Sequence, residues 1–244
     1  MAAVIATTTM YKALQDVRAK LAIETVKQAS ELGYEIIVVD NSPPEIKDIF
    51  RKYGAKVADS ATGMGVGRRI AIQLANDLTG TNGVIIWMEP EKAPLVPYLA
   101  KLIEPITAGI ADLVIPKRRS LSSYPLIQQH FEWLGNEAFR LLTGRVLDAW
   151  SGPRIFRPEI APYFLNYKGE YGDQWDSIFI PVLRAIKDGK KVIGVEVNYI
   201  HPAEQTAVED DFEMYQKRRY QLNTLIEAME KEAKILGLYP TTKI

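Results

Sequence analysis

Short apolar runs separated by amphipathic stretches organise the first half of the chain. Residues 2–6 and residues 34–40 are two such runs, and the second one, YEIIVVD, is rich in β-branched side chains. Unalternating apolar runs of this length are typical of strands that are covered on both faces, as in a parallel sheet. Between the two runs, apolar residues recur at helical spacing until Gly33 supplies a stop signal. The pattern predicts a β-α-β unit.

The same alternation continues along the chain. It predicts further helices over residues 45–53, 68–78, 126–142 and 175–187, and further strands over residues 56–58, 84–88, 113–116 and 191–199. Residues 120–124 are expected to form a polar loop, and residues 149–157 a turn that leads into a strand. A long amphipathic helix is expected from about Glu209 to Leu236. Strands that alternate with helices predict an α/β fold with a mainly parallel sheet, covered by helices on both faces.

Composition narrows the class of protein. With 244 residues, of which 47% are hydrophobic, the chain is suited to one α/β domain with a sizeable core. Its 30 basic and 30 acidic side chains cancel, so no overall field attracts nucleic acid. There is no cysteine, which excludes thiolate chemistry and fits a reducing, cytoplasmic location. No apolar run reaches the ~18 residues of a membrane span, so we expect no transmembrane segment.

Two carboxylates follow the apolar run at residues 84–88. Glu89 and Glu91 stand two residues apart, and alternate residues of an extended segment face the same side. Together they could hold one divalent cation, and such a hard oxygen site prefers Mg²⁺ or Mn²⁺. A solvated loop in which Pro90 ends the strand is the alternative. His201 also follows a predicted strand, although a packed or capped histidine is the more common reason for such a position.

A glycine run precedes the predicted helix at residues 68–78. Gly63, Gly65 and Gly67 would let the backbone approach a ligand, and Arg68 and Arg69 in the first helical turn favour a diphosphate. The run has neither the GxxxxGK[ST] nor the GxGxxG spacing of nucleotide-binding loops. A flexible structural loop is therefore the alternative.

Polar segments in the second half of the chain contain candidates for an acceptor site and for a general base. The segment DAWSGPR at residues 148–154 shapes either an acceptor pocket or a tight structural corner. Asp173 and Asp176 flank Trp175 before a predicted helix, where one of them would cap the helix and the other could be a general base. Three arginines are compatible with an anionic acceptor: Arg118, Arg119 and Arg145.

Taken in order, these segments resemble the GT-A glycosyltransferases of family 2, including the dolichyl-phosphate-mannose-synthase-like and mannosylglycerate-synthase-like enzymes. The likeness lies in residues 4–9, 35–42 (EIIVVDNS), 63–71, 85–91, 148–156 (DAWSGPRIF) and 173–201. EIIVVDNS and the SGPR-x-F turn are its most specific parts. The chain departs from the family where E-P-E replaces D-x-D, and where the first strand lacks the usual proline-tyrosine-asparagine-glutamate continuation.

The resemblance implies a GT-A fold and a role for each candidate residue. The nucleotide-sugar site would comprise Thr7, Thr9, Asp40, Gly63, Gly65, Arg69 and Glu89. The acceptor site would comprise Arg118, Ser151, Gly152 and Arg154. The metal ligands would be Glu89, Glu91 and His201. Asp176, with Asp173 as its rival, matches the position of the catalytic base in inverting members.

The expected function is metal-assisted transfer of a hexose from a UDP- or GDP-sugar to a small or lipid-linked hydroxyl acceptor. Residues 1–116 would form the nucleotide-sugar half and residues 117–208 the acceptor half of a single domain. The helical residues 209–244 would pack on this domain or form a homodimer seam. One alternative is a sugar-nucleotide nucleotidyltransferase, which would carry a glycine-rich, lysine-containing loop where this chain has TTTMYK. The other is a catalytically degraded scaffold protein.

Overall fold

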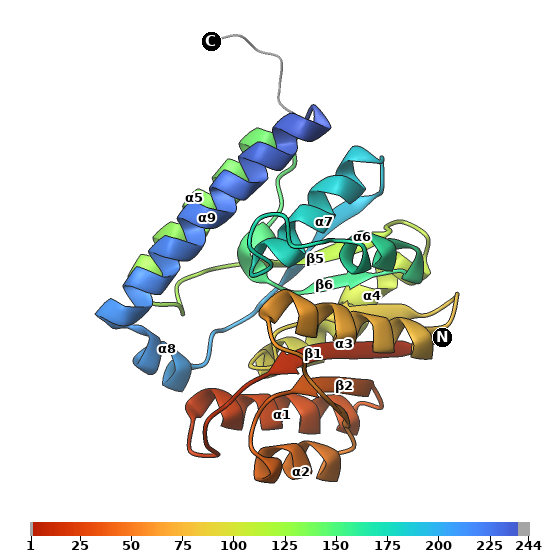
Figure 1. Cartoon of the computed structure of the whole chain (residues 1–244), viewed down its shortest axis with the longest axis vertical. Helices are drawn as coiled ribbons and strands as arrows, with labels where there is room; N and C mark the ends of the chain where they lie inside the picture. The colour runs from red at the N-terminus through yellow and green to blue at the C-terminus, as the bar shows by residue number, and fades with distance from the viewer. Residues whose placement is uncertain (1, 239–244) are drawn as a thin grey trace.

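A single seven-stranded sheet forms the centre of the computed structural model, which describes residues 2–238 (Figure 1). The strands are β1 (Ala3–Thr9), β2 (Glu35–Asp40), β3 (Lys56–Asp59), β4 (Val84–Trp87), β5 (Leu113–Arg118), β6 (Arg154–Phe156) and β7 (Val192–Val197). Their order in the sheet is β3-β2-β1-β4-β6-β5-β7. Only the short β6 runs antiparallel to its neighbours, β4 and β5, among the described strands. The predicted α/β fold with a mainly parallel sheet is confirmed.

Helices cover both faces of this sheet. They are α1 (Val17–Glu31), α2 (Pro44–Lys52), α3 (Met64–Thr79), α4 (Leu99–Thr107), α5 (Leu126–Thr143), α6 (Ala161–Leu165), α7 (Asp176–Lys187), α8 (Ala203–Glu209) and α9 (Phe212–Leu236). Three short 3-10 helices also occur: η1 (Ala93–Tyr98), η2 (Ala149–Ser151) and η3 (Pro158–Ile160). Helices α1, α2 and α4 contribute to the core on one face, and α3, α5, α6, α7 and α9 to the core on the other.

Alternate side chains of each strand point into opposite cores. Ile36 and Val38 of β2 pack on the side of α1, whereas Ile37 and Val39 pack on the side of α3. All four side chains are buried because both faces are covered. This double coverage explains why the strand sequences are continuously apolar.

The C-terminal helical region differs from the prediction. The long helix expected from about Glu209 to Leu236 is present as α9, which begins at Phe212, and an additional helix that was not predicted, α8, ends at Glu209 just before it. The break is fixed by Asp211, whose side chain accepts a hydrogen bond from the backbone N–H of Met214 (2.7 Å) as an N-cap. Helix α9 then runs beside α5 (Figure 1). Residues 239–244 of the predicted C-terminal segment lie outside the described residues.

The topology gathers loops at one edge of the sheet. Strands β1, β2, β3, β4, β5 and β7 are parallel, so their carboxyl ends lie at the same edge, and the segment that enters the antiparallel β6 begins there as well. In open α/β sheets this is the edge at which ligands bind. Among residues 2–238, no helix combines the length and apolar character that crossing a bilayer requires.

Candidate functional site

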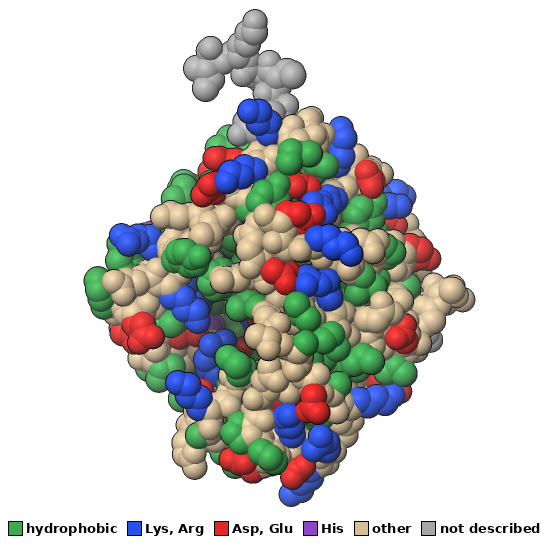
Figure 2. Space-filling model, viewed as in Figure 1, with side chains coloured by type: hydrophobic (Ala, Val, Ile, Leu, Met, Phe, Trp, Pro, Cys, Tyr) green, Lys and Arg blue, Asp and Glu red, His purple; other side chains and the backbone are tan. Residues whose placement is uncertain are grey.

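A cavity of about 690 Å³ opens at this edge, within the ~300–1,000 Å³ range that is usual for small-molecule sites. Its walls come from segments after β1, β2, β3 and β4, from the start of α3, from η2, and from helices α5, α8 and α9. Figure 2 shows this face hollowed beside α8 and α9, with Lys and Arg side chains at the rim. A second hollow, beside Lys92 and Arg118, is far smaller at about 10 Å³.

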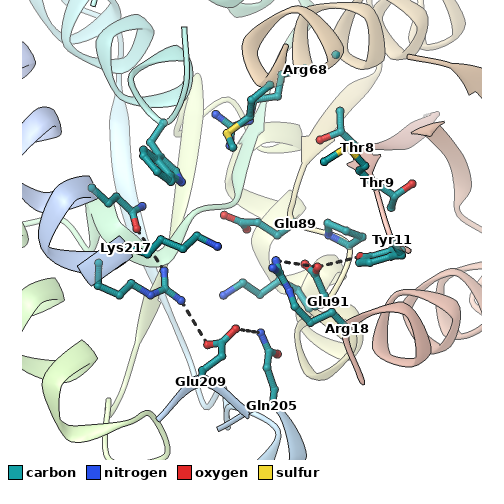
Figure 3. A pocket seen from close by; sticks show the side chains of 18 of the residues that line it. Thr8, Thr9, Tyr11, Arg18, Arg68, Glu89, Glu91, Gln205, Glu209 and Lys217 are labelled. Carbon is teal, nitrogen blue, oxygen red and sulfur yellow. Dashed lines mark hydrogen bonds and ion pairs between the residues drawn. The ribbon is translucent and has the colours of Figure 1, made fainter. Parts of the chain in front are cut away.

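One charged group of the wall is centred on Glu91 (Figure 3). Its Oε1 accepts a hydrogen bond from the Tyr11 hydroxyl (2.8 Å) and pairs with the Arg18 guanidinium (2.9 Å). Glu91 is buried, so this pairing offsets the cost of removing its charge from water. Conversely, burial and the Glu91 charge raise the pKa of Tyr11 well above its usual value.

A second charged group lies on α8 and α9. The buried Glu209 accepts a hydrogen bond from Gln205 (2.9 Å) and pairs with Arg218 (3.3 Å). Its Oε2 lies 3.6 Å from Nε2 of His201, which stacks on the Tyr124 ring with centroids 4.1 Å apart. Burial raises the pKa of Glu209, but His201 and Arg218 outweigh it and lower that pKa to about 2. Burial lowers the pKa of His201 below its usual value, against the opposing effect of Glu209.

Three cations of the wall have no carboxylate within salt-bridge distance in the described structure: Arg68, Lys92 and Lys217. We call them the cation cluster. Arg68 instead donates to the carbonyl of Gln174 (2.5 Å) and to the Ser177 hydroxyl (2.8 Å). Burial lowers the pKa of Arg68 to about 10, against the opposing charge of Glu89.

Lys92 and Lys217 approach the cavity from opposite elements. Lys92 follows the E-P-E motif, and its ammonium lies over the rings of Tyr124 and Tyr199, 5.9 and 5.0 Å from their centroids. Lys217 comes from α9 and extends toward Glu89 in Figure 3. Lys217 is exposed as a residue, but partial desolvation and the charges of Arg18 and Arg218 lower the pKa of its ammonium. Both cations therefore lie where an anion would be stabilised.

Six of the residues predicted from the sequence line the cavity: Thr9, Gly63, Glu89, Glu91, Ser151 and His201. The others lie behind its surface or beside it: Thr7, Asp40, Gly65, Arg69, Arg118, Gly152, Arg154, Asp173 and Asp176. Thr7 and Asp40 are buried just below the wall, and Oδ2 of Asp40 and Oγ1 of Thr7 have no hydrogen-bond partner in the described structure. Oδ1 of Asp40 accepts from the N–H of Ser42 (2.8 Å) and so shapes the turn after β2.

Gly65, Arg69, Asp173 and Asp176 form a joint between α3 and the loop before α7. Arg69 binds Asp173 through two hydrogen bonds (2.5 and 2.8 Å), and the N–H of Gly65 donates to the Asp173 carbonyl (2.9 Å). A Cβ on Gly65 would lie 2.0 Å from the Asp173 carboxylate, so only glycine fits there. Asp176 accepts from the Tyr167 hydroxyl and from the N–H groups of Asp173 and Gln174. These four residues hold the loop in place.

The SGPR turn brings its glycine against the E-P-E motif. Gly152 has φ +91°, and a Cβ there would lie 1.9 Å from Oε1 of Glu89, so the carboxylate lies against the bare backbone. Arg154 is fully buried and donates to the carbonyls of Ala149 (2.8 Å), Gly152 and Pro153 (both 3.0 Å). Arg118 forms a bidentate ion pair with Asp148 through two hydrogen bonds of 2.8 Å, and a second ion pair with Glu132 (2.5 Å). Arg118 is therefore paired within the protein, whereas Arg154 keeps Nε buried without a hydrogen-bond partner in the described structure.

Several wall residues were not among those that the family resemblance assigned to the site, although Arg68 was noted together with Arg69 as favouring a diphosphate. Arg68 has a helical signal, because Arg68, Ile72, Ala75 and Thr79 recur on the inward face of α3 whereas Arg69 does not. Lys92 stands next to the predicted motif. Arg18, Lys217 and Arg218 reach the cavity only through the packing of α1 and α9, for which the sequence carries no local signal.

The GT-A resemblance implies a divalent cation, and the carboxylates do not fit one well. No three His, Cys, Asp or Glu side chains among residues 2–238 converge closely enough to hold a metal ion. Glu91 is paired with Arg18, and His201 faces Glu209. Glu89 has one carboxylate oxygen, Oε2, that is buried without a partner in the described structure. A single such carboxylate, close to the cation cluster, is a poor donor set for Mg²⁺ or Mn²⁺.

Known proteins resemble this chain in structure rather than in sequence. No protein-family model matches it, and no curated protein sequence is similar to it. Glucosyl-3-phosphoglycerate synthase from Mycobacterium tuberculosis, solved with Mn²⁺, UDP and phosphoglyceric acid, superposes with a TM-score of 0.60 at 14% identity, covering 99% of this chain and 80% of that one. TarS 1–349 from S. aureus gives a TM-score of 0.55 at 14% identity, covering 100% of this chain and 76% of that one.

A third similar structure belongs to another enzyme class. CMP:2-keto-3-deoxy-manno-octonic acid synthetase, solved with CTP, superposes with a TM-score of 0.54 at 12% identity, covering 91% of this chain and 99% of that one. At these identities the similarity shows the fold. The chain has a GT-A-like fold, the architecture expected from the resemblance in its sequence.

Proposed function

We propose that this protein transfers a hexose from a nucleoside-diphosphate sugar to a hydroxyl acceptor in the cavity at the carboxyl edge of its sheet. The observation that carries the proposal is the cation cluster, which faces a cavity of about 690 Å³ on a GT-A-like fold. Cations without carboxylate partners are costly in a protein unless a ligand supplies the opposite charge. A diphosphate supplies that charge.

The wall suggests how the donor lies. Thr8, Thr9 and Asn41, at the ends of β1 and β2, would contact the nucleoside, while Arg68 and Lys217 would contact the diphosphate. The sugar would then lie near Glu89, with the acceptor approaching from the side of Trp150 and Ser151. As the glycosidic bond breaks, negative charge builds on the leaving diphosphate, and fixed cations stabilise that charge in the transition state.

Asp176 has a positioning role in this proposal and does not act as the general base. Its carboxylate accepts hydrogen bonds from Tyr167 and from two backbone N–H groups, and it does not line the cavity. Asp173 is paired with Arg69 in the same joint. Both carboxylates position the loop before α7, which carries Trp175 into the cavity wall.

The second candidate is nucleotidyl transfer, which the likeness to the CTP-bound synthetase favours. The two reactions release different products. Purified protein would be incubated either with UDP- and GDP-hexoses and candidate hydroxyl acceptors, or with nucleoside triphosphates and sugar phosphates. Release of a nucleoside diphosphate together with a glycosylated acceptor is the expected outcome. Pyrophosphate release from the triphosphates would instead establish the nucleotidyltransferase.

A further inference from the structure

The E-P-E segment is arranged differently from a divalent-cation site. A metal ion held by a D-x-D-like pair needs two carboxylates whose oxygens are free to converge on one point. Oε1 of Glu91 already accepts from Tyr11 and from Arg18, so the guanidinium occupies the position of a cation on that oxygen. A second positive ion there would be repelled by Arg18.

Glu89 lies among positive charges as well. Its carboxylate rests against Gly152, and its charge acts on Arg68, on Lys92 and on the buried Arg154. It has no salt-bridge partner within 4.0 Å among the described residues, so it balances the cation cluster at longer range. Two carboxylates of the wall, Glu89 and the exposed Asp16, have no salt-bridge partner among the described residues, so the three cations of the cluster outnumber the unpaired carboxylates by one.

Resting on the proposed function, we propose that Arg68, Lys92 and Lys217 neutralise the diphosphate of the bound nucleotide themselves, so that the site needs no divalent cation. Lys92 directly follows the motif in which family members hold a metal, and Lys217 extends toward Glu89 (Figure 3). Arg68 reaches the same cavity from the second turn of α3, near the N-terminus of a helix, which also favours negative charge. Three fixed cations match the charge of a nucleoside diphosphate.

The first experiment measures binding of UDP, GDP and CDP by calorimetry, in EDTA and in millimolar MnCl₂ or MgCl₂. The expected result is binding in EDTA with a Kd within about threefold of that with metal, and a steep weakening as salt rises. Binding that appears only with Mn²⁺ or Mg²⁺ overturns the inference and leaves the proposed function intact. Absence of binding under every condition overturns both.

The second experiment uses Glu89→Gln, because a metal site and a cation site predict opposite changes in nucleotide affinity for this variant. In a metal site, Glu89→Gln removes a ligand and weakens nucleotide binding. In the cation site it removes an unpaired carboxylate that lies close to the three cations and repels the diphosphate, so UDP or GDP should bind about two- to threefold more tightly. Weaker binding by the Glu89→Gln variant in MnCl₂, with Mn²⁺ titrated separately by its electron paramagnetic resonance signal, would contradict the inference.

The third experiment removes the cations one at a time. Lys92→Met and Lys217→Met should each lower the affinity for UDP or GDP in EDTA by about tenfold or more, because each deletes a charge-assisted contact. Arg68→Lys keeps the charge and tests Arg68 without emptying its buried position. Lys234→Met, an exposed lysine on the same helix as Lys217 and outside the cavity, is the matched control and should bind normally. Equal affinity in all three lysine variants would overturn the assignment.

Discussion

Charged residues in two neighbouring regions of this molecule have opposite surroundings. Beside the cavity, with Glu132 alone reaching its wall, Arg118 is bound by Asp148 and Glu132, and Arg69 is bound by Asp173; we call these five residues the paired region. Within the cavity, the cation cluster has no carboxylate partner in the described structure. Arg118 in the first region and Arg68 in the second are both buried away from water, but only Arg118 receives a counter-charge from the protein itself.

The difference separates stability from binding. A buried pair costs several kcal/mol when one partner is removed, because the other charge is left uncompensated. A cation without a partner already bears that cost in the folded protein, so its removal should spare stability. Such a cation is retained for a ligand. Mutations in the two regions should therefore have opposite profiles, with stability lost in one and affinity lost in the other.

The largest effect is expected for Asp148→Ala in the paired region. Although burial raises the pKa of Asp148, Arg118 and Asn136 hold it below its usual value, so the carboxylate is charged and fully used. Its loss leaves the buried Arg118 with Glu132 alone and should lower the free energy of unfolding by about 3–5 kcal/mol. Urea denaturation at pH 7 measures the change. A loss below about 1 kcal/mol would mean that the pair is solvated.

Arg69→Met should have a smaller effect of the same kind. The Arg69–Asp173 ion pair is bidentate, but the Arg69 side chain is 22% exposed and the Asp173 side chain 24% exposed. Solvent screening reduces such a pair to about 1–2 kcal/mol. A double-mutant cycle with Asp173→Asn isolates the interaction energy. A coupling energy near zero would show that the joint is held by Gly65 and the backbone instead.

Much of the fold could be predicted from the sequence, since strands buried on both faces leave an unambiguous signal. The runs that became β1, β2 and β4 are continuously apolar because both sheet faces are covered. Helix α8 was not predicted, and the start of α9 was placed about three residues too early, although Asp211 is an N-cap signal three residues before Met214. The antiparallel pairing of β6 has no local signal, because a three-residue strand owes its direction to its neighbours.

The candidate site was predictable only where topology determines position. Thr9, Glu89 and His201 follow parallel strands, and the carboxyl ends of those strands meet at one edge. Arg69 was chosen over Arg68, although the helical phase of α3 turns Arg68 inward and Arg69 toward Asp173. Lys217 enters the cavity through the packing of α9 against the rest of the molecule. No pattern within α9 itself indicates this contact.

Lys92→Met tests whether a cation of the cluster contributes to ligand binding rather than to stability. Because Lys92 is partly buried without a carboxylate partner, its replacement by an apolar side chain of similar length should change the free energy of unfolding by less than about 1 kcal/mol, or raise it. Thermal denaturation without ligand, followed by the same measurement with UDP or GDP, gives both quantities. The variant should lose most of the ligand-induced stabilisation. Strong destabilisation without ligand would place Lys92 among the structural charges.

The smallest effect is expected at Glu209, which lies in the cavity wall but is paired like the residues beside it. Its pKa is lowered from 4.5 to about 2 in the folded protein, so the folded state binds fewer protons there than the unfolded chain does. The stability from this carboxylate is therefore present above about pH 4.5 and is lost as the pH falls toward 2. Glu209→Gln should flatten the decline of the urea midpoint over that interval, whereas Glu204→Gln, an exposed change on the same helix, should not. Identical pH profiles for wild type and Glu209→Gln would show that Arg218 and His201 do not stabilise the Glu209 carboxylate. Glu209 would then resemble the charges of the cation cluster, which have no partner, rather than those of the paired region.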